Sequence, residues 1–229
     1  MIFNPQDPAT WPYFEPLIMA HDVGRSRDRS TAVIGGNGPS EPRLVGIKEL
    51  VELPQGLFGH ARASELAAID RRYGHNALIV ADLSNDATYA EVLFETFGPR
   101  VIGVHISRHG DGMTCERRPV KNGFILVYTI GRTYLIELFH TKMQNDQIRF
   151  VDGPMSRRAF DQLANLETEM RESGTVYTCP PGQHDDLGIS CAMLAWAARH
   201  PHLPYWVRTV ESARRPRRVP QKISWLAWT

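Results

Sequence analysis

Short apolar runs recur along the first half of the chain, separated by charged or glycine-containing stretches. Five of these runs are too short for typical helices and predict strands at 17–20, 31–36, 43–51, 77–81 and 101–106. Apolar residues at helical spacing predict two helices, at 57–73 and 86–97. Three consecutive strands, followed by helix, strand, helix and strand, predict a mixed sheet with helices on its faces.

The second half of the chain contains longer helical patterns. Its polar segment 110–122 predicts an exposed loop or ribbon, and 124–128 fits either a strand or the start of a helix. Three further helices are predicted at 132–144, 156–173 and 186–199, and two short strands at 148–151 and 175–178. The helix at 186–199 is strongly apolar, and we expect its Cys191 to lie in the core.

Composition narrows the class of protein. The 229 residues are 42% hydrophobic and carry a formal net charge of +1, so any contact with nucleic acid needs a local basic patch. The three cysteines lack C-x-x-C spacing, which argues against a disulfide framework or a zinc site. No apolar run approaches the roughly 20 residues of a membrane span, and residues 1–10 do not resemble a signal peptide. We therefore expect a cytoplasmic protein with no membrane partner.

Changes of composition suggest three parts. We expect an N-terminal extension at 1–15, one α/β domain at 16–203 and a C-terminal tail at 204–229. The tail is basic and proline-broken at 214–218, and Trp225 and Trp228 suggest that it docks on another surface.

Acidic residues lie at three of the predicted element ends. Asp22 follows the first strand, Asp82 follows the strand at 77–81, and Asp185 and Asp186 begin the last long helix. Functional groups of open α/β sheets gather at the carboxyl ends of the strands. Clustered carboxylates repel one another unless a cation lies between them, and their hard oxygen atoms suit Mg²⁺ or Mn²⁺. Two such ions about 4 Å apart catalyse phosphodiester hydrolysis, with Asp22 as the expected bridging ligand.

Each acidic position also has a simpler explanation. Asp185 is a suitable helix N-cap, Asp82 is able to cap the next helix or bind a loop amide, and Asp22 fits a turn stabilised by its own side chain. Taken singly, these explanations are as good as the metal site or better. The three places together, in this order, favour the metal site.

The order of the motifs resembles the RNase H-like nuclease domain of phage large terminases. The opening motif is Asp22-Val23-Gly24, followed by a charged loop that ends in Asp28-Arg29-Ser30-Thr31. The closing motif runs from Gly182 to Leu187 and contains the acidic pair, and an alanine-rich helix follows it. The resemblance covers roughly residues 16–201.

This resemblance implies an RNase H-like mixed central sheet flanked by helices. It also implies that Asp22, Asp82 and one or both of Asp185 and Asp186 bind metal, with two Mg²⁺ or Mn²⁺ ions expected. Within the acidic pair, we favour Asp185 as the direct ligand and Asp186 as its support. The implied activity is endonucleolytic cutting of double-stranded DNA during viral genome packaging, in the host cytoplasm. The implied partners are a packaging ATPase, the small terminase and the portal.

One feature of large terminases is missing from the sequence. The chain has no Gly-x-x-x-x-Gly-Lys-Ser/Thr loop, so we expect either an isolated nuclease domain or a separate ATPase chain.

Several basic residues lie near the predicted site or in exposed segments. Lysine and arginine contacts to phosphates are the sequence-independent part of DNA binding. The candidates for such contacts are Arg25, Arg27, Arg29, Arg108, Arg117, Arg118 and Lys121. Any one of them, taken alone, is explained as well by a solvated loop charge.

Three other functions fit parts of the pattern. Asp-x-Gly before a threonine-containing strand also opens the actin-like ATPase and sugar-kinase fold, but the second Asp-x-Gly loop of that fold is absent. RuvC-type resolvases and transposases use similar carboxylate triads on branched DNA or transposon ends. A catalytically inactive RNase H-like module would only dock DNA or a packaging partner. A plasmid-nicking assay with Mg²⁺ or Mn²⁺ separates these functions.

Overall fold

The computed structural model describes residues 2–3, 16–24, 29–38, 44–84, 86–108, 113–171 and 174–214. Within these residues, nine strands form one sheet with the order β1-β9-β4-β3-β2-β5-β6-β8-β7. The strands are β1 (Ile2–Phe3), β2 (Leu17–Asp22), β3 (Thr31–Asn37), β4 (Val45–Glu52), β5 (Leu78–Asp82), β6 (Val101–Ser107), β7 (Met113–Val120), β8 (Gly123–Gly131) and β9 (Ile148–Val151).

The sheet mixes two kinds of pairing. Strands β2, β3 and β4 form an antiparallel meander, whereas β2, β5, β6 and β8 run parallel to one another. The edge strand β7 precedes β8 in the chain and pairs with it antiparallel. It forms the exposed ribbon predicted within 110–122. The prediction of a mixed α/β sheet is therefore confirmed.

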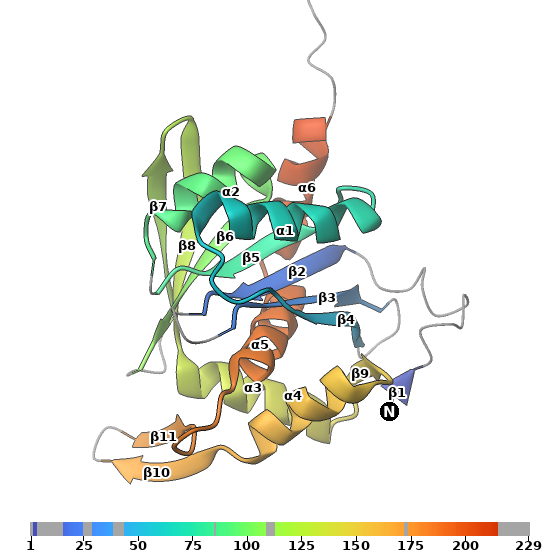
Figure 1. Ribbon diagram of the computed structural model, residues 1–229, viewed down its shortest axis with the longest axis vertical. Helices are drawn as coiled ribbons and strands as arrows, with labels where there is room; N and C mark the ends of the chain where they lie inside the picture. The colour runs from blue at the N-terminus through green and yellow to red at the C-terminus, as the bar shows by residue number, and fades with distance from the viewer. Residues whose placement is uncertain are drawn as a thin grey trace, which may run out of the picture.

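Helices cover both faces of the sheet (Figure 1). On one face lie α1 (Gly59–Arg72) and α2 (Tyr89–Phe97), which the short helix η2 (Gly98–Arg100) follows. On the other face lie α3 (Arg132–Gln144), α4 (Pro154–Ala164) and α5 (Asp186–Arg199). The side chains of α5 are buried without interruption from Leu187 to Ala198, because this helix packs between the sheet and the two outer helices. Cys191, the residue of this helix that was predicted to lie in the core, is fully buried, so that prediction is confirmed.

The last described helix, α6 (Leu203–Arg214), begins where the tail is predicted. Its Trp206 is buried and stacks on His200 at a centroid distance of 4.7 Å. Residues 204–214 therefore form a helix anchored on the domain. The basic segment beyond Arg214, with Trp225 and Trp228, lies outside the described residues, as does most of 1–15.

The predicted helix at 156–173 is wrong in its second half. Helix α4 ends at Ala164, and β10 (Glu167–Arg171) pairs antiparallel with β11 (Gly174–Thr178). Met170, which the helical pattern placed on the apolar face, has 82% of its surface exposed. The helical spacing beyond Ala164 was coincidental, because pairing with β11 supplies the backbone hydrogen bonds of this segment instead.

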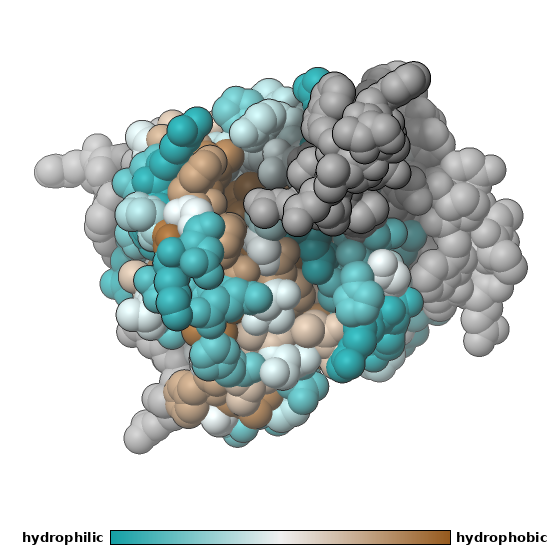
Figure 2. Space-filling model, turned by 90° about the horizontal axis from the view of Figure 1, so that it is seen from above, coloured by the Kyte–Doolittle hydropathy of each residue, from teal (hydrophilic) through white to brown (hydrophobic). Residues whose placement is uncertain are grey.

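Hydrophobic and hydrophilic side chains are unevenly distributed on the face seen from above. Apolar residues gather near the middle of this face, between hydrophilic ones (Figure 2). A cavity of about 240 Å³ lies between α2, β8 and α6, with Phe94, Phe124 and Trp206 in its lining.

None of the helices in the described part of the chain is long and apolar enough to cross a bilayer.

Candidate metal centre

Two of the predicted acidic residues lie at the ends of neighbouring parallel strands. In the pairing of β2 with β5, His21 is opposite Ala81, so Asp22 and Asp82 follow at the same height. Side chains alternate along a strand, and Ala20 on β2 belongs to the apolar cluster under α5. Asp22 therefore lies on the α5 face of the sheet, and the same alternation places Asp82 there.

The start of α5 is fastened to two other elements. The hydroxyl of Thr31 donates to the carbonyl oxygen of Asp186 at 3.1 Å and is hydrogen-bonded to the hydroxyl of Ser190 at 2.7 Å. The backbone N–H of Gly188 donates to the side-chain oxygen of Gln162 on α4 at 3.0 Å. These bonds fix the first turn of α5, and with it the acidic pair, against β3 and α4.

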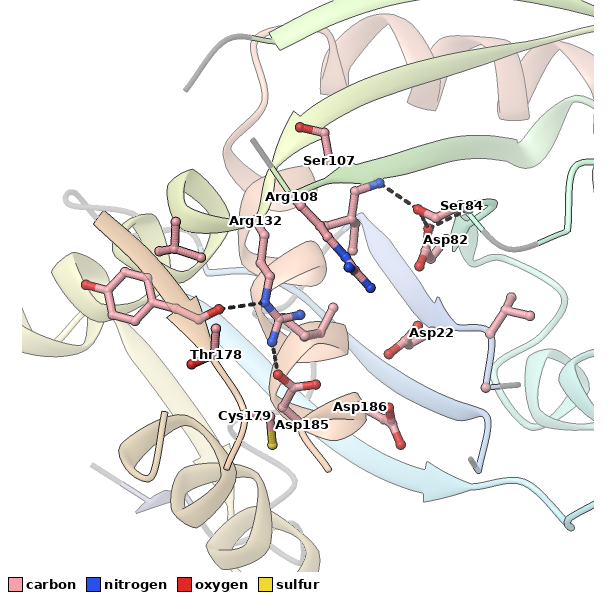
Figure 3. A pocket seen from close by; sticks show the side chains of 16 residues that line it. Asp22, Asp82, Ser84, Ser107, Arg108, Arg132, Thr178, Cys179, Asp185 and Asp186 are labelled. Carbon is pink, nitrogen blue, oxygen red and sulfur yellow. Dashed lines mark hydrogen bonds and ion pairs between the residues drawn. The ribbon is translucent and has the colours of Figure 1, made fainter. Parts of the chain in front are cut away.

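All four acidic residues line one cleft of about 540 Å³ (Figure 3). The cleft lies between the carboxyl ends of β2, β5 and β6, the start of α5 and the strand β11. Its polar lining comprises Asp22, Asp82, Ser84, Ser107, Arg108, Arg132, Tyr177, Thr178, Cys179, Asp185 and Asp186. The structure thus brings together residues that are up to 164 positions apart in the sequence.

Asp82 is the most buried of the four carboxylates, with 6% of the residue exposed. Its Oδ1 accepts hydrogen bonds from the backbone N–H of Ser84, at 2.8 Å, and from the Ser84 hydroxyl. The same hydroxyl accepts from the N–H of Ile106 at 2.7 Å. Burial raises the pKa of Asp82, while the Ser84 bonds and the nearby His105 oppose that rise. The loop-amide contact considered for Asp82 is therefore present within the cleft.

Asp185 does not cap α5 with its side chain, although it occupies the N-cap position. Its Oδ2 accepts a hydrogen bond from Nη2 of Arg132 at the start of α3. Nε of Arg132 donates to the carbonyl oxygen of Tyr177 at 3.3 Å. Burial lowers the pKa of Arg132, and the charges of Asp22 and Asp186 counteract this effect.

Arg132 is the charged residue of the cleft lining that sequence reasoning missed. Its ion pair with Asp185 joins positions 53 residues apart, so no local motif contains it. One signal was available, because an arginine in the first turn of a helix faces the positive end of the helix dipole and calls for a nearby anion.

The donor atoms suit a hard divalent cation. Four carboxylates in one cleft supply the oxygen ligands that Mg²⁺ and Mn²⁺ prefer. Among the described residues, however, no three aspartate, glutamate, histidine or cysteine side chains are grouped closely enough to hold one ion. Two of the four carboxylates are held by Ser84 and Arg132, so binding an ion requires side chains in the cleft to turn.

The predicted basic residues are only partly brought to this cleft. Arg108, at the end of β6, lines it. Arg29 instead forms an ion pair with Glu52 at 2.8 Å and is not part of the cleft lining. Arg25 and Arg27 lie outside the described residues.

The remaining basic candidates lie along the edge of the sheet. Arg117 on β7 is opposite Leu126, five residues before the cleft end of β8 at Gly131, and hence roughly 15–20 Å from it. Arg118 follows on β7, and Lys121 lies in the turn beyond it. These three residues do not line the cleft.

A buried histidine lies behind the cleft. His21 precedes Asp22 and therefore occupies the opposite face of β2, where its ring contacts Tyr89 edge-on at 5.9 Å. Nδ1 of His21 is hydrogen-bonded to the carbonyl oxygen of Thr31 at 2.7 Å. Burial lowers the pKa of His21 to about 4, so the ring is neutral at pH 7. Nearby, Arg62 donates to the carbonyl oxygen of Gly24 at 3.4 Å.

The strand order and the helices define an RNase H-like fold. Its centre is the antiparallel meander β4-β3-β2, continued by the parallel strands β5 and β6, with helices on both faces. No protein-family model matches the sequence, and no curated protein sequence matches it.

Among solved structures, the fold is that of large terminase nuclease domains. The large terminase nuclease from thermophilic phage G20c, with bound cobalt, is 19% identical at a TM-score of 0.55, covering 80% of this chain and 83% of that chain. The nuclease domain of the large terminase from bacteriophage SPP1, with bound Mn, is 15% identical at a TM-score of 0.53. The match covers 86% of this chain and 94% of that chain. The human cytomegalovirus terminase nuclease domain, Mn-soaked and inhibitor-bound, is 12% identical at a TM-score of 0.54. The match covers 89% of this chain and 92% of that chain. The chain thus has the terminase nuclease fold.

Proposed function

We propose that this protein is a metal-dependent endonuclease that cuts double-stranded DNA during viral genome packaging. One observation carries the proposal. Carboxylates from the ends of two neighbouring parallel strands and from the start of the helix that crosses them line a single cleft. The fold shared with terminase nuclease domains supports the same function.

The proposed metal ligands are Asp22, Asp82, Asp185 and Asp186, and the expected cofactors are two Mg²⁺ or Mn²⁺ ions. Three structures of the same fold were solved with cobalt or manganese, which supports a divalent ion here. Such ions, when bound, activate a water molecule and stabilise the leaving oxygen of a phosphodiester. Asp22 is the proposed central ligand, because β2 lies beside β5, which ends in Asp82, and packs against α5, at whose start Asp185 and Asp186 lie.

The residues of this chain have further roles in the proposed reaction. Ser84 holds one oxygen of Asp82 and thereby fixes its orientation. Thr31 and Gln162 hold the first turn of α5, which keeps Asp186 at the cleft. Arg108 supplies a positive charge for a DNA phosphate. A packaging ATPase, the small terminase and the portal are the proposed partners, in the cytoplasm of an infected cell.

A plasmid assay tests the proposal. Purified protein with Mg²⁺ or Mn²⁺ is expected to convert supercoiled plasmid to nicked and linear forms, and EDTA to stop it. Asp22→Asn, Asp82→Asn and Asp186→Asn are each expected to lower the rate by more than about a hundredfold, beyond the usual cost of losing a supporting contact. Asp161→Asn, on the exposed surface of α4, is the matched control and keeps the wild-type rate.

Two results contradict the proposal. Folded wild-type protein that neither binds Mn²⁺ nor cuts DNA would exclude the nuclease. A strong preference for four-way junctions over linear duplex would instead favour the resolvase-type activity.

A further inference from the structure

We infer that Arg132 binds a DNA phosphate in the cleft and that Asp185 holds its guanidinium group there while DNA is absent. This inference rests on the proposed nuclease function and adds a substrate-positioning residue to it. When DNA binds, its phosphate replaces the carboxylate of Asp185 as the partner of Arg132.

Arg132 begins a helix and faces the cleft. The residue opens α3, where the positive end of the helix dipole disfavours a cation. Its guanidinium nevertheless points into the cleft and is fixed by Asp185 and by the carbonyl oxygen of Tyr177 (Figure 3). Holding a cation at this unfavourable place is useful if an anion binds beside it.

The guanidinium group of Arg132 is suited to binding a phosphate. A guanidinium carries five N–H donors in a planar fork, which suits carboxylate and phosphate oxygens equally. Arg132 contacts Asp185 through Nη2 and Tyr177 through Nε. A phosphate is therefore able to replace the carboxylate on Nη2 while the bond to the Tyr177 carbonyl keeps the side chain in place.

Positive and negative side chains share the cleft, with the negative ones in excess. Arg108 and Arg132 both project into the cleft, which also contains all four carboxylates (Figure 3). With the carboxylates ionised, these six side chains carry a formal charge of −2, which one divalent ion neutralises. A phosphodiester then adds one negative charge, and a carboxylate released from Arg132 is available for a second divalent ion.

Asp185 makes an unusual contact for an N-cap residue. An aspartate at an N-cap ordinarily accepts a bond from the first turn of its own helix. Here Gln162 of α4 accepts the N–H of Gly188, and the side chain of Asp185 is directed to Arg132. The pair is partly exposed, with 22% of the Arg132 side chain and 14% of the Asp185 side chain accessible, so a ligand in the cleft can reach both groups.

The inference predicts opposite effects on DNA and metal binding. Arg132→Met is expected to weaken binding of a short duplex about tenfold and to reduce the salt slope of the affinity by about one phosphate contact. In DNA-free protein, the same substitution is expected to tighten Mn²⁺ binding about threefold or more, because it removes a cation and frees a carboxylate. Asp185→Asn, which removes one negative charge from the cleft, is expected to weaken DNA-free Mn²⁺ binding by only about threefold, whereas Asp186→Asn weakens it more than about tenfold.

Duplex binding is measured by fluorescence anisotropy in the Asp22→Asn background at several salt concentrations, so that the DNA is not cut. Mn²⁺ binding to DNA-free protein is measured by electron paramagnetic resonance. Arg157→Met, which removes an exposed arginine on α4 outside the cleft lining, is the matched control and should leave both affinities unchanged. Arg132→Lys keeps the charge without the planar fork, and its loss of DNA affinity should be smaller than that of Arg132→Met.

The inference would be overturned if the DNA affinity of Arg132→Met and its salt slope equalled those of the wild-type protein. So would a loss of Mn²⁺ affinity in Asp185→Asn as large as in Asp186→Asn. If circular dichroism shows that Arg132→Met is unfolded, the DNA and Mn²⁺ affinities of Arg132→Lys and Asp185→Asn decide whether Arg132 binds a DNA phosphate. Wild-type protein that binds neither Mn²⁺ nor DNA would defeat the proposed function as well. If the wild type binds both and Arg132→Met binds DNA equally well, only the role of Arg132 is defeated.

Discussion

Acid should destabilise this protein through His21, a buried residue one position before a proposed metal ligand. Burial lowers the pKa of His21 to about 4, compared with 6.5 for a free histidine, and its Nδ1 is committed to the carbonyl oxygen of Thr31. The unfolded chain therefore takes up a proton at a higher pH than the folded protein does. The contribution of neutral His21 to stability is fully present above pH 6.5 and is lost as the pH falls from about 6.5 toward 4.

The size of the effect follows from the two pKa values. One unit of pKa difference corresponds to about 1.4 kcal/mol. Linkage between 6.5 and about 4 then predicts a loss of about 1.4 kcal/mol at pH 5.5 and about 2.5 kcal/mol at pH 4.5, relative to pH 7.5. Such a loss is a large fraction of the stability of an ordinary domain.

Urea unfolding followed by tryptophan fluorescence measures this loss at pH 7.5, 6.5, 5.5 and 4.5. Because carboxylates also titrate in this range, the quantity to compare is the difference between the wild type and His21→Asn. Asparagine retains an N–H donor for the Thr31 carbonyl but does not titrate, so the two stability curves should converge on acidification. His60→Asn, at an exposed histidine of α1, should instead run parallel to the wild type. Parallel curves for His21→Asn would refute the reasoning.

Three further substitutions test other parts of the fold and site. Asp70→Asn leaves Arg100 without its buried anionic partner, which lies at 2.8 Å, and should cost about 3 kcal/mol in urea unfolding. Gly35→Ala places a Cβ atom 2.0 Å from a carbonyl oxygen of β4 and should lower stability by about 1–3 kcal/mol in the same assay, with wild-type stability as the contrary result. Ser84→Ala removes a donor that lowers the pKa of Asp82, so the acidic limb of the Mn²⁺-dependent cutting profile should move to higher pH, and an unmoved profile would contradict this.

The sequence was most informative where burial and strand ends coincide. The run before Asp82 is apolar because β5 is covered on both faces, and the acidic residue stands out at its end. The same logic located Asp22, and the start of α5 located the acidic pair. These positions follow from local pattern plus one rule on strand ends, so the convergence of the four carboxylates could be anticipated.

Contacts between distant segments could not be anticipated. The helical pattern through Met170 had no local stop, and only pairing with β11 shows that the segment is a strand. Likewise, Arg132 acquires its place in the cleft from Asp185, which reaches it through the packing of α3 against α5. The distance of Arg117 from the cleft depends on the register of β7 with β8, which a single strand pattern does not contain.

The burial of α5 has a consequence for how the cleft loses its shape. Because residues Leu187–Ala198 are enclosed on all sides, the helix is expected to exchange its amide hydrogens only when the whole domain opens. The acidic pair at its first turn is thereby tied to the most protected part of the molecule, while the opposite wall is formed by the peripheral strand β11. Mild heat or denaturant should loosen the β11 wall first and leave the carboxylates of α5 in place until the core itself unfolds.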